Sequence, residues 1–332
     1  MNTTNPEDTR ARRGVTVAQM ADEWLEVSRG RLKRSTLSSY GTTVRAHILP
    51  TLGGRSIARL KAGDIEGFLG SKSGLSPRTV YNISTVLRGV FFYAKNRGYI
   101  KNIPVWTCPR ARVRTEAGVM LPEERRALEC YLAAEPDGEK AGLLLCLYTG
   151  MRLGEICALR WGDISQARHT VSIRRTVQRV YSTGGRTELL LDTPKSASSV
   201  RTIPIPAFLW DILEPFRAGD ECFVLTGKPG LLEPRTMQNH FKAILKKCGL
   251  RDINFHAIRH TFATDCVEAG FDIKTISSIL GHSSVAVTLN TYVHPSFDSM
   301  RRMMDGLESR FSQVNTLAKG PGSGPIHVRA QK

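Results

Sequence analysis

Five short segments place polar side chains within otherwise apolar, helical sequence. They are Thr149-Gly-Met-Arg-Leu-Gly-Glu, Thr193-Pro-Lys, His256-Ala-Ile-Arg-His, Leu280-Gly-His and Thr291-Tyr-Val-His. Each segment alone has an ordinary structural explanation, such as an i,i+3 ion pair between Arg152 and Glu155 or an exposed lysine in a turn. Together they supply two arginines, a lysine, two histidines and a tyrosine, with no cluster of carboxylates. This set suits a dianionic, phosphorane-like transition state that is attacked by a phenolic oxygen.

The two arginines of these segments, Arg152 and Arg259, are suited to hold a phosphate. A guanidinium stays charged at neutral pH, and its planar fork matches two oxygens at once. His256 stands three residues before Arg259, so a helix directs both side chains toward one face. The sequence therefore predicts that the two arginines bind the non-bridging oxygens of one phosphate.

Tyr292 is the expected nucleophile. Its hydroxyl has an ordinary pKa of about 10, so it requires cationic neighbours and a base, for which His256 is the candidate. The departing 5′ oxygen requires an acid, and Lys195 can deliver that proton if the arginines and burial lower its pKa. The predicted reaction exchanges one phosphodiester for another through a 3′-phosphotyrosine, and it demands no ATP, metal or other cofactor.

The elements that must position these residues follow from apolar periodicity and from turn residues. Before residue 100, Thr16 is a good N-cap, Ser76-Pro77 provides a cap and an N1 proline, and Pro50 together with the Gly53-Gly54 pair is expected to stop the second helix. The predicted helices of this part are 16–30, 35–48, 62–69 and 76–98, which form a compact four-helix unit. Later helices are predicted at 121–135, 139–148, 153–159, 207–216, 234–248, 256–269, 273–280, 285–292 and 296–307. Strands at 170–181, 188–192 and 200–205 predict a small antiparallel sheet.

The chain carries a formal charge of +17, and the excess is concentrated near its start. Residues 1–118 contain 20 basic and 8 acidic side chains, against 27 and 22 in the remainder. Basic residues stand among hydroxyls and aromatics in the segments 31–36 and 76–81, a mixture that favours phosphate contact over an ordinary solvated surface. The predicted DNA-binding residues are Arg31, Lys33, Arg34, Arg78, Arg110 and Arg112.

Composition excludes several classes of protein. Hydrophobic residues make up 41% of the 332 residues and charged residues 23%, as in folded proteins rather than disordered or collagen-like chains. The longest apolar run, residues 141–148, is far shorter than the roughly 20 residues of a membrane span, and the polar start contains no signal segment. Seven cysteines without a CxxC pair predict buried thiols in a reducing cytoplasm.

Other functions fit the polar segments less well. His256 and His260 have the H-x-x-x-H spacing of a zinc protease, but Ala257 occupies the position of the essential glutamate. Gly227-Lys228 lacks the upstream glycine of a phosphate-binding loop, and the acids near the motifs form no D-x-D pair for a metal-dependent transposase. A non-catalytic, helical DNA-binding regulator would explain the charge and the helices but not the six polar residues.

The motifs resemble those of tyrosine recombinases of the phage integrase family, and within it integrases of phages and conjugative transposons from Gram-positive bacteria. The pattern T-G-x-R-x-x-E matches residues 149–155, H-x-x-R-H matches 256–260 and L-G-H matches 280–282. The tyrosine lies ten residues after that last histidine. The resemblance implies Glu155 as a supporting acid and His260 as a residue behind the site. The implied catalytic residues are Arg152, Lys195, His256, Arg259, His282 and Tyr292.

The resemblance implies a multidomain, mainly α fold. A SAM-like, four-helix core-binding domain would precede an α+β catalytic domain of tyrosine recombinase type with a small antiparallel sheet. The expected divisions are a flexible arm at 1–14, the DNA-binding core-binding domain at 15–100, a basic linker at 101–118, the catalytic domain at 119–307 and a flexible tail at 308–332. Many integrases of this subgroup carry a further arm-binding domain, which residues 1–14 are too few to form, and the sequence leaves open whether that domain is absent or removed.

The resemblance also implies partners. They are double-stranded DNA core or attachment sites, a homotetramer on paired sites and an excisionase-type directionality factor, with no membrane. The implied location is the cytoplasm of a bacterial host, in association with the nucleoid. The apolar stripe of the helix expected at 296–307 can pack on its own domain or, as is usual in the family, dock on a neighbouring subunit. Nothing in the sequence indicates the attachment site or the bias between integration and excision.

Overall fold

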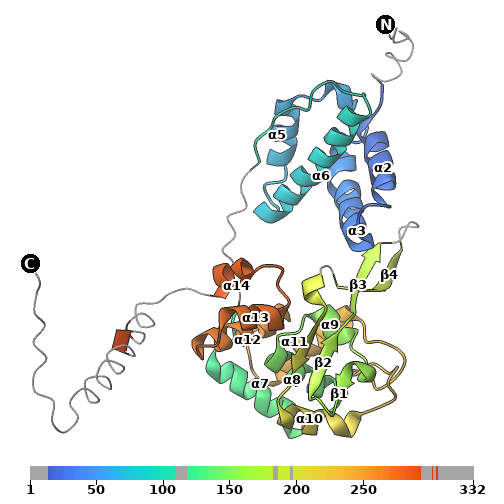
Figure 1. The fold of residues 1–332 in the computed structure, drawn as a ribbon. Coiled ribbons are helices and arrows are strands. Elements are labelled where there is room, and N and C mark those ends of the chain that lie inside the picture. The colour runs from blue at the N-terminus through green and yellow to red at the C-terminus, as the bar shows by residue number, and fades with distance from the viewer. Residues whose placement is uncertain are drawn as a thin grey trace, which may run out of the picture.

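The computed structural model describes residues 14–108, 118–181, 186–194 and 197–292, with helical residues at 301, 304 and 305. These residues form an N-terminal helical lobe and a larger C-terminal lobe of helices and short strands (Figure 1). Several predicted segments lie outside the described residues: the tail, nearly all of the arm, half of the linker and most of the helix expected at 296–307. Within the described ranges, no helix is both long and apolar enough to cross a membrane.

Capping residues set the starts of the helices in the N-terminal lobe. The Gln19 backbone N–H donates to Thr16 Oγ1 at 3.3 Å, and the Thr16 N–H donates to Gln19 Oε1 at 2.9 Å, which is a capping box. The Thr79 N–H donates to Ser76 Oγ at 3.1 Å at the start of the longest helix. The elements are α2 (Val17–Ser28), α3 (Arg34–Thr43), the π-helical turn η1 (Val44–Ile48), α4 (Leu49–Leu52), the 3-10 turn η2 (Ile57–Arg59), α5 (Ala62–Gly70) and α6 (Pro77–Asn96).

Of the residues predicted to stop the second helix, Pro50 does not end it, so that part of the prediction is wrong, whereas the helical run does end at the predicted Gly53-Gly54 pair. The chain continues through η1, in which the Leu49 N–H donates to the Val44 carbonyl, into α4. Proline has no N–H and is tolerated in the first turn of a helix, so Pro50 lies at the start of α4 behind the wider π turn. The helix ends at Gly53, where a Cβ would lie only 2.6 Å from the Leu49 carbonyl oxygen.

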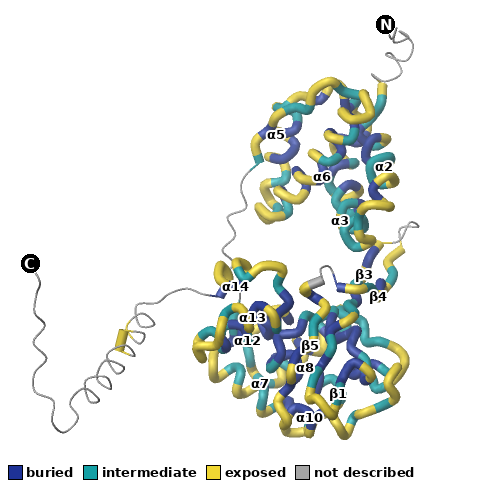
Figure 2. Tube along the Cα trace, viewed as in Figure 1, coloured by how far each residue is buried: buried dark blue, intermediate teal, exposed yellow. Residues whose placement is uncertain are grey.

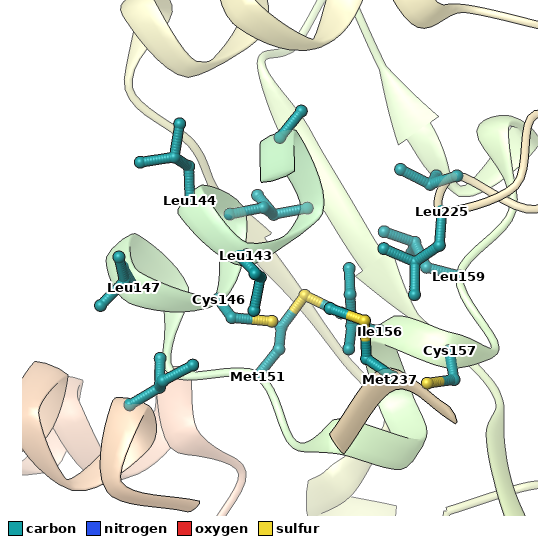
Figure 3. Packing of buried hydrophobic residues seen from close by; sticks show 14 of the residues in the cluster. Leu143, Leu144, Cys146, Leu147, Met151, Ile156, Cys157, Leu159, Leu225 and Met237 are labelled. Atoms are coloured by element: carbon teal, nitrogen blue, oxygen red, sulfur yellow. The ribbon is translucent and has the colours of Figure 1, made fainter. Parts of the chain in front are cut away.

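Helix α8 (Gly138–Thr149) is the central element of the C-terminal lobe. The tube of this helix is buried along most of its length (Figure 2), so the longest apolar run of the sequence forms a core helix. Its residues Leu143, Cys146 and Leu147 belong to one apolar cluster with Met151 and Ile156 (Figure 3). The other helices of this lobe are α7 (Pro122–Ala134), α9 (Leu153–Cys157), α10 (Ala207–Leu213), α11 (Pro234–Lys247), α12 (His256–Glu268), α13 (Ile273–Leu280) and α14 (Val285–Tyr292).

The segment 170–181, predicted as one strand, is two strands in two sheets. Strand β2 (Thr170–Ile173) lies between β1 (Ile164–Ser165) and β5 (Arg201–Pro204), whereas β3 (Thr176–Tyr181) pairs with β4 (Thr187–Asp192). All of these pairs are antiparallel, as the sequence predicts. The strand is interrupted at Arg174-Arg175, where the Arg175 guanidinium binds the buried carboxylate of Asp163.

The two lobes touch where α3 meets the β3–β4 hairpin (Figure 1). The Tyr181 backbone N–H donates to the Ser38 hydroxyl at 2.7 Å. Arg34 forms an ion pair with Glu188 of β4, and the Lys33 ammonium donates to the Pro194 carbonyl at 3.0 Å. Two residues predicted to bind DNA therefore contact the C-terminal lobe.

The seven cysteines are free thiols, but the expectation that they are buried is correct for only part of the set. Burial raises the pKa of Cys157 to about 12, which makes this thiol unreactive at neutral pH. Cys130 of α7, in contrast, is exposed. Leu128 and Leu132 are buried and define the inner face of that helix, so a residue midway between them points outward.

Candidate active site

Arg152 lies where α8 ends and α9 begins. Gly150 ends α8 in the left-handed conformation with φ +63°, and a Cβ there would lie 2.7 Å from the side chains of Phe262 and Leu280. Arg152 is the N-cap of α9, and its backbone N–H and Nη1 donate to Glu155 at 2.9 and 2.7 Å. The Arg152 side chain remains 35% exposed, so part of its guanidinium is open to a ligand.

Arg259 of α12 is buried beside Arg152, with 2% exposure. Its Nη1 donates to the Gly150 carbonyl at 2.9 Å, and its Nη2 donates to the Leu280 carbonyl at 2.7 Å. Burial and the charge of Arg152 lower the pKa of Arg259 to about 9, so this guanidinium is still charged at neutral pH. The carbonyl ends of α8 and α13 thus hold the cation.

A third arginine, Arg201 of β5, belongs to the same cluster and was missed by the sequence reasoning. Its Nη1 and Nη2 donate to the two carboxylate oxygens of Glu155 at 3.1 and 2.9 Å, and its Nε donates to the Ile279 carbonyl. The sequence did contain a signal for Arg201, namely the alternation of inward- and outward-facing residues along the strand. Arg201 shares a face with the buried Ile203, so the period of two places an arginine toward the core.

Three consecutive carbonyls at the end of α13 each bind a different arginine. A helix C terminus presents unpaired carbonyls with partial negative charge, which attract cations. The end of α13 therefore fixes the spacing of the three guanidiniums. The pairs are Ile279 with Arg201, Leu280 with Arg259, and Gly281 with Arg152, the last at 3.3 Å.

Three histidines line the cluster. The rings of His256 and His260 on α12 meet edge to face with centroids 4.5 Å apart, and His282 Nδ1 shares a 2.8 Å hydrogen bond with Thr288 Oγ1. Although part of the His256 ring is exposed at the rim, desolvation and neighbouring cations lower the pKa of both His256 and His282 to about 4. Both imidazoles are therefore neutral at pH 7 and able to accept a proton.

Tyr292 ends α14 and lies among these groups, with 9% exposure. The centroid of its ring is 5.4 Å from that of His260 and 6.4 Å from that of His282. Burial raises the pKa of the Tyr292 hydroxyl, whereas the charges of Arg259 and Arg152 act in the opposite direction. The structure thus brings the predicted nucleophile together with both predicted arginines and all three histidines of the motifs.

Of the remaining predicted residues, those that the structure describes lie outside this cluster. Arg31 and Arg78 are exposed on the N-terminal lobe, and the Arg78 guanidinium lies 5.8 Å from the centroid of the Tyr81 ring. Exposed cations on this lobe are available to a polyanion. The residues Lys195, Arg110 and Arg112 lie outside the described residues.

The charge balance of the cluster favours an anionic ligand. Three guanidiniums, those of Arg152, Arg201 and Arg259, face the single carboxylate of Glu155. An anion that enters beside Arg152 would meet this excess of positive charge next to the Tyr292 phenol. Among the described residues, no group of three or more His, Cys, Asp or Glu side chains is placed to hold a metal ion.

The sequence matches two known families. It matches the phage integrase family over residues 127–299 and the N-terminal SAM-like domain of phage integrases over residues 16–73. A tyrosine recombinase XerC-like protein of Caldanaerobacter subterraneus is 30% identical over 312 residues, which cover 84% of this chain and 79% of that protein. The transposase of transposon Tn916 from Enterococcus faecalis is 25% identical over 292 residues, which cover 80% of this chain and 71% of that one.

Solved structures share the fold. The Tn1549 transposon integrase in complex with a circular intermediate DNA has a TM-score of 0.72 at 24% identity, covering 88% of this chain and 99% of that chain. A lambda integrase tetramer bound to a Holliday junction has a TM-score of 0.62 at 17% identity, covering 89% and 84%. The SAM-like helical lobe followed by a helical lobe with small antiparallel sheets is thus the fold of this class of enzyme.

Fold and site together define a DNA recombinase of the tyrosine type. The chain belongs to the phage integrase family, and its activity is site-specific DNA recombination. The fold class and the family that the motifs indicate are confirmed. The domain boundaries and the roles of single site residues stay predictions.

Proposed function

We propose that this recombinase cuts and rejoins DNA strands through a 3′-phosphotyrosine on Tyr292, and that it thereby integrates or excises a mobile element. The observation that carries the proposal is the convergence of Tyr292, Arg152 and Arg259, which come from three separate segments of the chain. A phosphate attracted to the two guanidiniums would lie beside the phenol, in reach of attack.

In the first step, the Tyr292 oxygen forms a bond to phosphorus while the bond from phosphorus to the 5′ oxygen breaks. His256 is the proposed acceptor of the phenolic proton, because its ring is unprotonated at neutral pH and has a lone pair free to take it, although its lowered pKa makes it a weaker base than an ordinary histidine. Lys195 delivers a proton to the departing 5′ oxygen. In the second step, a 5′ hydroxyl of the partner duplex attacks the phosphotyrosine and the phenol regains its proton. One phosphodiester is thus exchanged for another.

The charge that develops on the phosphate requires donors that are already in place. Arg152 and Arg259 bind the non-bridging oxygens, and each is oriented by a backbone carbonyl at the end of α13. His282 Nδ1 and the Thr288 hydroxyl share a hydrogen bond, and in the tautomer in which the hydroxyl donates, neutral His282 carries its proton on Nε2 and donates it to a phosphate oxygen. Losing one comparable donor in other enzymes costs on the order of 100- to 1,000-fold in rate.

Two supporting residues hold these groups. Glu155 accepts hydrogen bonds from the backbone and from the side chain of Arg152, which fixes the direction of that guanidinium. The His260 ring is in contact with the rings of both His256 and Tyr292. We assign positioning roles to Glu155 and His260 because both contact catalytic side chains.

The proposed substrate is double-stranded DNA at core or attachment sites, and the proposed active assembly is a homotetramer on paired sites. The net charge of +17 and the exposed Arg31 and Arg78 of the N-terminal lobe support a grip on the duplex from that lobe. The similar lambda integrase is a tetramer bound to a Holliday junction, and the similar Tn1549 integrase is bound to DNA. We also expect an excisionase-type directionality factor, on the strength of the family alone.

A nicked duplex tests the proposal. A core sequence is selected from a random library by binding to the full chain, and a nick beside the cleaved phosphate then traps the covalent adduct. The wild type should form this adduct, whereas Tyr292→Phe should form none. Tyr131→Phe is the control, because this tyrosine of α7 faces the Lys140 ammonium rather than the site. An adduct formed by Tyr292→Phe would contradict the proposal and would reopen the alternative of a DNA-binding regulator.

A further inference from the structure

Arg201 is bound inside the protein through all three nitrogens of its guanidinium. In addition to Glu155 and Ile279, its Nη1 donates to the Ser199 carbonyl at 3.1 Å, so every nitrogen of the group has a protein acceptor. The side chains of Arg201 and Glu155 are 7% and 2% exposed. Arg259 and Arg152 both act on the Tyr292 hydroxyl, and Arg259 also shares a side-chain hydrogen bond with it. The nitrogens of Arg201 bind protein oxygens elsewhere, so Arg201 is assigned no contact with DNA.

We infer that Arg201 is a positioning residue for strand cleavage, which holds Glu155 and the end of α13 so that Arg152 and His282 meet the phosphate in the right geometry. The inference deepens the proposed function and rests on it. Arg201 reaches these residues from β5, a strand that is remote in sequence from both the Arg152 and the His282 segments.

The first part of the argument is electrostatic. Burial alone would raise the pKa of Glu155, but hydrogen bonds and charge from Arg201, together with Arg152, lower it, so the carboxylate is ionised. Because Arg201 binds both oxygens of this carboxylate, its charge offsets that of Glu155. The charge of Arg152 then remains available to the phosphate. Without Arg201, the charge of Glu155 would be offset by Arg152 and Arg259 alone, and less positive charge would remain for the phosphate.

The second part concerns the loop that carries His282. Gly281 has φ +65°, and a Cβ on it would lie 3.0 Å from both Cδ and Nη1 of Arg201. The glycine of the L-G-H motif thus packs directly against this arginine, and the Arg201 Nε binds the Ile279 carbonyl two residues earlier. Arg201 therefore holds the turn that directs His282 toward Tyr292 on one side and the Gly281 carbonyl toward Arg152 on the other.

The test compares two arginines that each bind a buried carboxylate in the same lobe. Arg201→Lys keeps the positive charge but loses the fork that binds both Glu155 oxygens. Arg175→Lys makes the same change at the pair between Arg175 and Asp163, which lies outside the cluster. Both full-length variants are assayed for equilibrium binding to the selected core duplex, for single-turnover adduct formation at saturating protein and for thermal unfolding.

Arg201→Lys should bind the duplex within about twofold of the wild type, because Arg201 does not contact DNA. It should form the adduct on the order of 100-fold more slowly, since small displacements of catalytic groups have effects of that size. Arg175→Lys should change neither the affinity for the duplex nor the rate of adduct formation by more than about threefold, because the pair between Arg175 and Asp163 is remote from the reacting groups. In Arg201→Ala, added guanidinium ion should restore part of the cleavage rate.

Two results would overturn the inference. One is cleavage by Arg201→Lys at the wild-type rate. The other is a parallel loss of binding, cleavage and thermal stability, which a merely structural arginine would produce. If Arg201→Lys does not fold, the combined variant Arg201→Gln/Glu155→Gln removes the buried charges together, and wild-type cleavage by that variant would refute the inference. A failure of the proposed function would be seen in a different variant, because Tyr292→Phe would then still form the covalent adduct with DNA.

Discussion

Replacing Gly281 with alanine tests whether the end of α13 positions the arginines. Alanine at φ +65° costs about 1–2 kcal/mol, because a Cβ is disfavoured in the left-handed region. In addition, the new methyl would lie 3.0 Å from two atoms of Arg201 and from the Ser198 carbonyl oxygen. Arg201 cannot easily move away, since Glu155 and Ile279 hold it, and overpacking of this kind costs about 1–3 kcal/mol.

Gly270 provides a matched control for this change. It follows α12 with φ +79°, and a Cβ there would meet nothing within 4 Å. Gly270→Ala should therefore lower the free energy of unfolding by only about 1–2 kcal/mol, against about 2–5 kcal/mol for Gly281→Ala. Urea denaturation measures both values. Single-turnover cleavage of the core duplex should remain at the wild-type rate in Gly270→Ala and fall on the order of 100-fold in Gly281→Ala. Equal cleavage by the two variants would refute the reasoning.

Three further predictions concern protonation, salt and the leaving group. As the pH falls from about 6.5 to about 4, the free energy of unfolding of the protein without DNA should decrease. The reason is that His256 and His282 bind protons in this pH range in the unfolded chain but not in the folded chain, where their pKa is about 4. His282→Gln should reduce this pH dependence in urea titrations, and an unchanged dependence would contradict the account. The logarithm of DNA affinity should fall steeply with the logarithm of salt concentration. Arg78→Ala should make this slope less negative by about 0.9 if the change removes one phosphate contact. An unaltered slope in binding titrations would show that Arg78 is not at the DNA interface. Lys195→Ala should slow cleavage of an ordinary duplex far more than cleavage of a duplex with a 5′-thio leaving group, which barely needs an acid, and equal slowing of the two would rule out the acid role.

Much of the site was readable from short-range spacing. Arg152 and Glu155 stand at i,i+3, and the structure pairs them at the start of α9. Gly150, placed between an apolar run and this pair, ends α8 in the left-handed conformation that favours glycine. His256 and His260, one helical turn apart, lie in ring contact on α12. In these cases local backbone geometry alone determines which side chains meet.

Contacts between distant segments could not be read in this way. Arg201 acquires its role because β5 packs beside the end of α13, a pairing set by tertiary packing rather than by the strand itself. Arg34, predicted from its neighbours to bind DNA, forms an ion pair with Glu188 across the two lobes, a contact that the sequence did not indicate. Likewise, Arg175 lies at the break in a segment that alternates in sequence, and it binds Asp163, a buried residue twelve positions earlier. Side-chain partners far along the chain override local periodicity at these positions.

Mass spectrometry of the peptide that remains attached to DNA tests the central claim most directly. The full chain is incubated with the nicked core duplex, digested with protease and nuclease, and the modified peptide is sequenced. The account predicts a single nucleotide remnant joined through its 3′ phosphate to Tyr292, the tyrosine that lies beside Arg259, His260 and His282. A phosphate on any other residue, or attachment through a 5′ phosphate, would contradict it.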